Sequence, residues 1–391
     1  MDLLDWLAAP GIHLGPVISE GVRAYRGAAQ WHEVPDVEPS LGIAMGAVLD
    51  RAFTVATNVI TGVPTPETVR HLNHDAAALR DFFEAHDWIR DPAGYYAAPP
   101  PVTEWTSAEA VTWLGARRRP YEHLRWLSGY KPYLDEPGRD HWLSREANRL
   151  FHATVLEHPG EPRPWLVCVH GFAMGSPLVN FNGFAARFLH DELGLNLVFP
   201  CLPLHGPRRG GRVSGGELLE TDFVNVVHTF AQAIWDLRRT LSWVRTRQPT
   251  HVGLYGISLG GYLSALTTAL EDRIDCVIAS IPMVDFTTAA QDNEPWIFRR
   301  YEREFEIDYD VVRAITRVVS PLSLESRVPR ERRYICAGTA DRVVRPNHAR
   351  ALWRHWDRPE IHWFPGGHVL GMMHPTIPPF IERSVRSAGM I

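Results

Sequence analysis

Lysine and cysteine are scarce in this chain of 391 residues. Lysine occurs once, at Lys131, so arginine carries nearly all of the positive charge. No two cysteines form a CxxC pair, and each lies in or beside a β-branched apolar run, where a free thiol behaves as a small hydrophobic side chain. We therefore expect buried, reduced cysteines. They are Cys168, Cys201, Cys276 and Cys336.

The chain also lacks a basic excess and a long hydrophobic run. Its 40 basic and 45 acidic residues give a net charge of -5, which leaves no basic field for a phosphate backbone and argues against nucleic acid as a partner. The longest apolar stretch, residues 41–60, has Asp50 and Arg51 at its middle, so we expect no transmembrane segment. Asp2 and Asp5 stand where a signal peptide carries basic residues, which predicts a cytoplasmic protein.

The N-terminal third reads as helical. Residues 41–60 and a segment beginning at Thr65 repeat apolar residues at three- and four-residue steps, which predicts two helices, the second capped by Thr65 and started by a proline. A Thr-x-x-Glu sequence at Thr106 fits a capping box and predicts a short helix that ends near Pro120. We expect residues 1–140 to form a helical region that packs on a second body.

From about residue 148, short β-branched runs alternate with long helical patterns, which is typical of a mainly parallel sheet with crossover helices. The clearest helix spans residues 223–244. A charged and aromatic stretch at residues 287–327 interrupts the alternation, is too long for a simple connection and predicts an inserted cap. Strands are expected at residues 150–156, 166–170, 195–199, 252–256, 276–281, 334–337 and 361–364.

A serine flanked by glycines is the sharpest motif. Ser258 stands in Gly256-Ile-Ser-Leu-Gly260, between an expected strand and a helical pattern. A serine on such a tight turn is held in strained geometry, and the glycines remove side chains that would clash there. The N-terminus of the following helix favours a developing oxyanion. This context favours a nucleophile over a helix-capping serine, with the backbone N–H of Leu259 as one oxyanion donor.

A second oxyanion donor is expected in the loop after an earlier strand. Residues 166–170 form an apolar run that ends in His170-Gly171-Phe172-Ala173. We assign the second donor to the backbone N–H of Phe172, with Ala173 as the alternative. For His170 we favour a structural role in shaping the loop over a catalytic one.

A serine hydroxyl needs a histidine to take its proton and a carboxylate to orient that histidine. Asp341 follows an expected strand in Gly338-Thr-Ala-Asp341, and His368 follows the last strand in Gly366-Gly367-His368, where the glycines let the chain turn. Asp285 also follows a strand and is the alternative acid, although it opens the inserted segment as a turn or cap residue does. His362 and His374 lack the glycine-hinged position, so His368 is the expected base.

These four motifs, in this chain order, resemble those of the α/β-hydrolase superfamily. The resemblance covers roughly residues 148–391, and the first 140 or so residues resemble no named family. It implies an α/β-hydrolase fold, to which the residue patterns add an inserted cap and an N-terminal helical extension. It also implies a serine hydrolase that uses Ser258, Asp341 and His368 and needs no cofactor.

The expected activity is cleavage of a small-molecule carboxylic ester through an acyl-enzyme, with Trp296 and Tyr301 of the cap contacting the acyl chain. An oligopeptidase-type serine peptidase usually carries a repeat propeller, whereas the N-terminal region here is unrepeated. Thioesterase and acyltransferase activity stay open, as does a non-catalytic binding protein with a hydrolase fold. The sequence carries no signal for acyl chain length or oligomeric state.

Histidines raise the question of a metal site, because there are 19 of them and pairs such as His71 and His74 occur. No cluster combines an HExxH-like spacing with carboxylate or cysteine partners, so we expect no metal. The arginines at positions 208, 209 and 212 could contact an acidic substrate group, but a polar loop is the favoured interpretation.

Overall fold

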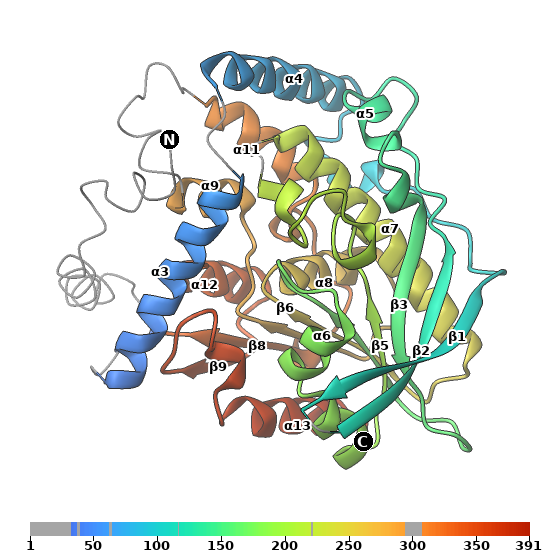
Figure 1. Cartoon of the computed structure of the whole chain (residues 1–391). Helices are drawn as coiled ribbons and strands as arrows, with labels where there is room; N and C mark the ends of the chain where they lie inside the picture. Colours follow the sequence, from blue (N-terminus) through green and yellow to red (C-terminus); the bar gives the residue numbers. More distant parts are fainter. Residues whose placement is uncertain (1–32, 37–39, 62–64, 116, 220–221, 294–306) are drawn as a thin grey trace.

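The computed structural model describes residues 33–36, 40–61, 65–115, 117–219, 222–293 and 307–391 (Figure 1). The strands are β1 (Thr106–Leu114), β2 (Arg117–Leu127), β3 (Leu150–Leu156), β4 (Trp165–Val169), β5 (Asn196–Pro200), β6 (Val252–Ile257), β7 (Cys276–Ser280), β8 (Arg333–Gly338) and β9 (Glu360–Phe364). Within the described residues they form one sheet in the order β1-β2-β3-β5-β4-β6-β7-β8-β9. The seven strands expected from residue 150 onward are confirmed.

The sheet is antiparallel at one end and parallel through the rest. β3 pairs antiparallel with β2 and β5, whereas β5, β4, β6, β7, β8 and β9 are parallel. The register places Val169 beside Gly256 and Gly338 beside Phe364. The segments that follow β4, β6, β8 and β9 therefore leave the sheet at the same edge, the carboxyl edge, where open α/β sheets bind ligands.

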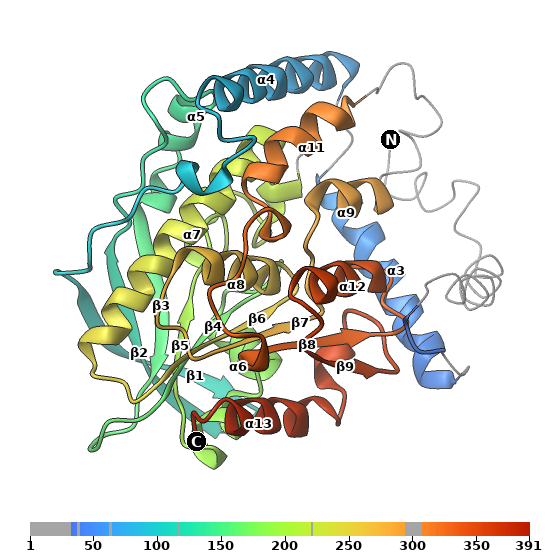
Figure 2. The ribbon, with the colours of Figure 1, turned by 180° about the vertical axis from the view of Figure 1, so that it is seen from behind.

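Helices cover both faces of the sheet (Figures 1 and 2). One face carries α7 (Phe223–Thr246), α8 (Leu259–Leu270), α11 (Tyr309–Val318) and α12 (Pro346–His355), and the other carries α6 (Pro177–Gly183) and α13 (Ile377–Ser387). Side chains of a strand alternate between the two layers, so that Val167 belongs to the first buried cluster and Leu166 and Cys168 to the second. All four cysteines are buried and free, as expected.

The N-terminal helices are α3 (Leu41–Thr61), α4 (Pro66–Ala85) and the short α5 (Arg139–Leu143). α4 begins as predicted, since the Thr65 hydroxyl accepts a hydrogen bond of 3.1 Å from the N–H of Thr68. It packs against α7 and α11, and Phe83 belongs to the same buried cluster as the residues of α7. No helix among the described residues is both long and apolar enough to cross a membrane.

The helix expected at Thr106 is wrong, because the residues there form the β1–β2 hairpin. The prediction that residues 1–140 are helical therefore fails for these two strands, and the sheet begins well before residue 148. Most of β1 is exposed, and its larger apolar residues Val111 and Trp113 lie at exposed positions, so its hydrophobic pattern did not mark a half-buried strand. Pro120 is tolerated in β2 because β3 pairs with β2 only from Glu122 onward, which leaves that edge of the strand free.

α3 exists as expected, but its larger apolar residues do not form its buried face. Leu41 is 79% exposed and Met45 is 54% exposed. Gly46, Asp50 and Thr54 are buried instead, at a spacing of four residues that defines one face of the helix. The buried face of α3 is therefore made of small and polar residues.

Candidate active site

Ser258 lies on the turn between β6 and α8, with φ of 56° and ψ of -114°. A positive φ is costly for a residue with a side chain and persists only where the surroundings impose it. Close packing does so here, because a Cβ at Gly256 would overlap the carbonyl oxygen of Gly260, and one at Gly260 would overlap the carbonyl oxygen of Val169. The serine hydroxyl is held at the carboxyl edge of the sheet.

A continuous chain of hydrogen bonds joins Ser258, His368 and Asp341. The hydroxyl of Ser258 lies 3.0 Å from Nε2 of His368, and Nδ1 of the same ring lies 2.7 Å from Oδ2 of Asp341. The other carboxylate oxygen of Asp341 accepts the N–H groups of Val343 at 3.0 Å and Val344 at 2.8 Å. The loop after β8 thus orients the carboxylate, and the carboxylate orients the imidazole.

The charge of Asp341 changes the acid-base properties of His368. Burial disfavours the imidazolium, but the charge and the hydrogen bond of Asp341 outweigh it, and the pKa of His368 is raised above its ordinary value of 6.5. Burial also raises the pKa of Asp341, although the facing imidazole opposes this effect. A ring in this position can accept a proton from the serine hydroxyl and return it to a leaving group.

The expected oxyanion donors are the backbone N–H groups of two residues in the cavity wall. Within the part of the chain that the structure describes, the N–H groups of Phe172 and Leu259 have no hydrogen-bond partner. Both residues line the cavity that contains Ser258. A Cβ at Gly171 would lie 3.4 Å from the Cβ of Ser258, so this loop passes directly beside the serine. Ala173 lines the same cavity, with φ of 63°.

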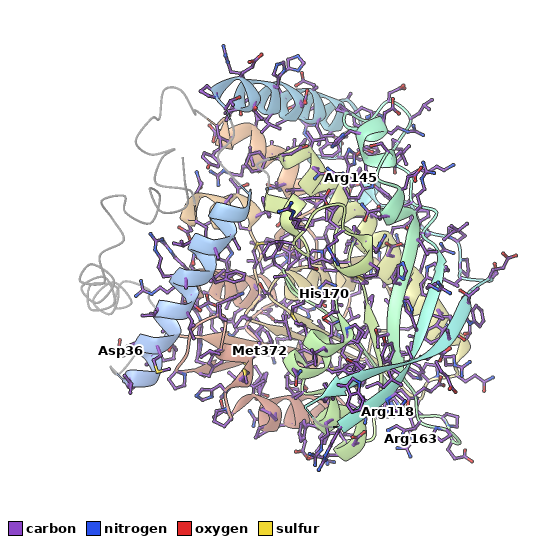
Figure 3. All side chains as sticks on the ribbon, viewed as in Figure 1. Asp36, Arg118, Arg145, Arg163, His170 and Met372 are labelled. Atoms are coloured by element: carbon purple, nitrogen blue, oxygen red, sulfur yellow. The ribbon has the colours of Figure 1, made fainter. Side chains whose placement is uncertain are left out.

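His170 has the contacts of a structural residue. It is fully buried, accepts the N–H of Leu202 on Nε2 at 3.1 Å and donates from Nδ1 to the carbonyl of Gly171 at 2.8 Å. Burial, with the neighbouring His205, lowers the pKa of His170 to about 3, so the ring is neutral. It ties the loop after β4 to the segment after β5. Figure 3 labels His170 in the interior and Met372, which lines the cavity.

The alternative acid and the alternative bases make hydrogen bonds elsewhere. The carboxylate of Asp285 caps α9 (Phe286–Asp292) by accepting the N–H of Thr288 at 3.0 Å and its hydroxyl at 2.8 Å. His362 and His374 both contact the hydroxyl of Thr376. Asp285 therefore has the cap role that the sequence suggested.

Arg208 is not available to a substrate. Its side chain is fully buried, forms an ion pair of 2.8 Å with Asp236 and donates to the carbonyls of Asn148 and Cys201. The polar-loop interpretation is therefore wrong for Arg208, which cross-links the interior below the loop after β5, whereas Arg209 and Arg212 are exposed as that interpretation expects.

A cavity of about 790 Å³ opens at Ser258 and His368. Apolar side chains make up most of its wall, and none of the described residues that line it is Asp, Glu, Lys or Arg. The inserted segment contributes Ile307 and Tyr309, together with residues of α9 such as Phe286. The expected substrate-binding residues Trp296 and Tyr301 lie outside the described residues.

α3 contributes to this site, which the sequence did not predict. Phe53, Thr54 and Thr57 line the cavity, and the carboxylate of Asp50 contacts the segment that carries His368. The available signal was an acidic residue in the middle of an otherwise apolar helix, which served only to exclude a membrane span.

Comparisons with known proteins bear on the fold and the family. Residues 234–367 match the prolyl oligopeptidase family. Two solved structures share the fold at low sequence identity: an acetyl xylan esterase from a Thermoanaerobacterium species (TM-score 0.53, 16% identity, 77% of this chain and 93% of that chain) and one from a Paenibacillus species (TM-score 0.50, 15% identity, 76% and 98%).

Two curated proteins of Mycobacterium tuberculosis match the whole chain. "Uncharacterized protein MT2702" from strain CDC 1551 / Oshkosh and "Uncharacterized protein Rv2627c" from strain ATCC 25618 / H37Rv are each 36% identical over 391 residues, with 92% of each protein covered. The sheet order, the strained serine turn and these matches agree. The chain belongs to the α/β-hydrolase superfamily and, within it, to the family of these two mycobacterial proteins.

Proposed function

We propose that this protein is a serine hydrolase that cleaves carboxylic esters through an acyl-enzyme. The observation that carries the proposal is the hydrogen-bonded chain from Ser258 through His368 to Asp341, built on a strained turn beside two unpartnered N–H groups. A serine in an ordinary capping role needs neither the strain nor the histidine.

In the proposed reaction the oxygen of Ser258 attacks the ester carbonyl while Nε2 of His368 takes the hydroxyl proton. Asp341 holds the ring and stabilises the imidazolium. The oxyanion is bound by the N–H groups of Phe172 and Leu259. When the carbon–oxygen bond breaks, the imidazolium gives its proton to the departing alcohol. Water then attacks the acyl-enzyme by the same route, and the acid leaves with Ser258 restored.

The cavity supports an uncharged, hydrophobic substrate. Its described lining offers no charged partner for the terminal amine or carboxylate of a short peptide, and none for an anionic acyl group. An alkyl or aryl ester fits this lining. We propose that residues 287–327 act as the cap, with Trp296 and Tyr301 in contact with the substrate, and that the N-terminal region packs on the hydrolase body.

A serine peptidase is the second candidate, because residues 234–367 match the prolyl oligopeptidase family. The two candidates differ in the leaving group that they accept. An ester releases an alcohol, whereas a peptide releases an amine that must be protonated as it departs.

The test is labelling of the purified protein with a fluorophosphonate probe, combined with hydrolysis of p-nitrophenyl butyrate and of a peptidyl p-nitroanilide. We expect labelling and ester cleavage, and Ser258→Ala should abolish labelling and lower kcat by several orders of magnitude. Ser107→Ala, at an exposed serine of β1, is the matched control and should behave as wild type. Faster cleavage of the anilide would favour the peptidase, and an unlabelled wild-type protein would favour a non-catalytic binding protein.

A further inference from the structure

Asp50 of α3 is a fully buried carboxylate bonded to the segments that carry both His368 and Asp341. The N–H of His368 lies 2.9 Å and 2.8 Å from its two oxygens, and the N–H of Val369 lies 2.9 Å from Oδ1. Oδ2 also accepts the N–H of Arg342 at 3.0 Å. One side chain from the N-terminal region thus accepts three backbone N–H groups from two loops.

The helix approaches these loops closely, and glycine permits it. A Cβ at Gly46 would lie 3.4 Å from the nitrogen of Gly367, and a Cβ at Gly367 would lie 2.7 Å from Oδ2 of Asp50. Gly367 does not have a positive φ, so the backbone there would accept alanine. The Asp50 carboxylate is thus a second reason for glycine next to His368, beside the turn that the sequence suggested.

We propose that Asp50 is a positioning residue, which holds the loop of His368 and the loop of Asp341 in register so that the imidazole faces Ser258. The inference rests on the proposed function, since it assigns to Asp50 a part in bringing the three groups together. Both loops leave the sheet separately, after β9 and after β8, and a common anchor keeps their separation constant.

The energetics favour such an anchor. Hydrogen bonds from N–H groups to a buried carboxylate are stronger than neutral ones. Removal of the acceptor would take from three partly buried N–H groups the carboxylate that they share, and the loops would then shift to restore hydrogen bonds. Small displacements of reacting groups cost rate steeply, on the order of 10²-fold for about 1 Å.

Asp50 also acts on the base electrostatically. The charged groups that face the His368 ring are Asp341, through its hydrogen bond, and Asp50, and both raise the pKa of the ring. Replacing Asp50 by an uncharged residue removes one of these charges. The pKa of His368 then falls, and the pH at which the neutral base forms moves toward acid.

The same helix forms part of the cavity wall. Phe53, one turn beyond Asp50, packs edge to face on Phe172 with ring centroids 6.1 Å apart. Figures 1 and 2 both show α3 at the β8–β9 end of the sheet. The anchor therefore lies on an element that also touches an expected oxyanion residue.

The test measures the rate of fluorophosphonate labelling at Ser258 as a function of pH in the full-length protein. Asp50→Asn should lower the labelling rate on the order of 10²-fold. It should also shift the rising limb of the pH–rate profile to lower pH. Gly367→Ala keeps the charge of Asp50 but displaces its carboxylate. This variant should therefore lower the labelling rate and leave the rising limb of the pH–rate profile nearly where it is in wild type. Thermal unfolding establishes that each variant is folded.

Glu136→Gln is the matched control. Glu136 is also a buried carboxylate of the N-terminal region and accepts a backbone N–H, that of Tyr133 at 2.8 Å, but it does not line the cavity. We expect its labelling rate and its pH limb to equal those of wild type.

The outcomes separate the two proposals. If the wild-type protein is not labelled at Ser258, the proposed function fails and this inference fails with it. If the wild type is labelled and Asp50→Asn reacts at the same rate with the same limb, only the role of Asp50 is overturned. A slow Asp50→Asn variant with an unmoved limb would indicate general loosening of the fold and would also overturn it.

Discussion

The apolar cavity predicts that longer acyl chains are better substrates. At about 790 Å³ it is far larger than an acetyl group needs, and its described lining carries no charge. Each methylene that leaves water for such a lining contributes at most ~0.8 kcal/mol, which corresponds to about a fourfold increase in kcat/KM. Lengthening the acyl group from acetate to hexanoate adds four methylenes, so the upper bound is a gain of roughly 200-fold.

The assay is a series of p-nitrophenyl esters from acetate to octanoate, with kcat/KM determined for each. Ala290→Phe places a ring at the cavity wall on α9. Overpacking costs roughly 1–3 kcal/mol, so hexanoate hydrolysis should fall about tenfold or more while acetate hydrolysis changes less. Gln291→Phe is the control, because Gln291 is the next residue of the same helix, is exposed and does not line the cavity.

A flat or falling series would refute the reasoning, because it would place the acyl group outside this cavity. Equal losses on acetate and hexanoate in Ala290→Phe would also refute it, since they would indicate damage to the reacting groups instead of a shortened binding site.

Two further predictions concern carboxylates. Asp341→Asn should lower kcat for ester hydrolysis by roughly 10⁴-fold, because the imidazole of His368 would adopt the wrong tautomer. Asp285→Asn should change kcat little. The reverse order would make Asp285 the acid. Burial raises the pKa of Glu136 from 4.5 to about 7, so its contribution to stability is present below about pH 4.5 and is lost as the pH rises through about 7. Urea unfolding at pH 5 and pH 8 should show that the free energy of unfolding of wild type falls by up to roughly 3 kcal/mol between these pH values, and that it falls less in Glu136→Gln. Equal decreases in both proteins would contradict this assignment.

Much of the sheet was predictable from the sequence because its central strands are buried on both faces. Short, mostly apolar runs such as those of β4, β6 and β7, in which every residue is buried, are typical of parallel strands. The hairpin of β1 and β2 was not predictable from its own residues. β1 is largely exposed, and pairing of β2 with β3 is what holds the hairpin in the sheet.

The sequence by itself determined the local features of the candidate site. Glycines around Ser258, the His-Gly loop at His170 and the small residues before Asp341 are requirements of short turns, and short turns are encoded by neighbouring residues. The hydrogen bonds that join Ser258, His368 and Asp341 were expected from chain order, and their lengths come from the fold.

Only the tertiary structure decided what α3 contributes. Its hydrophobic pattern pointed to the wrong face, because Gly46 and Asp50 pack against the loops after β8 and β9 while Leu41 and Met45 face outward. The partners of Asp50 lie about 300 residues away in the chain. Such a contact depends on backbone N–H groups, which every residue except proline has. The pattern of side chains in the sequence therefore could not predict it.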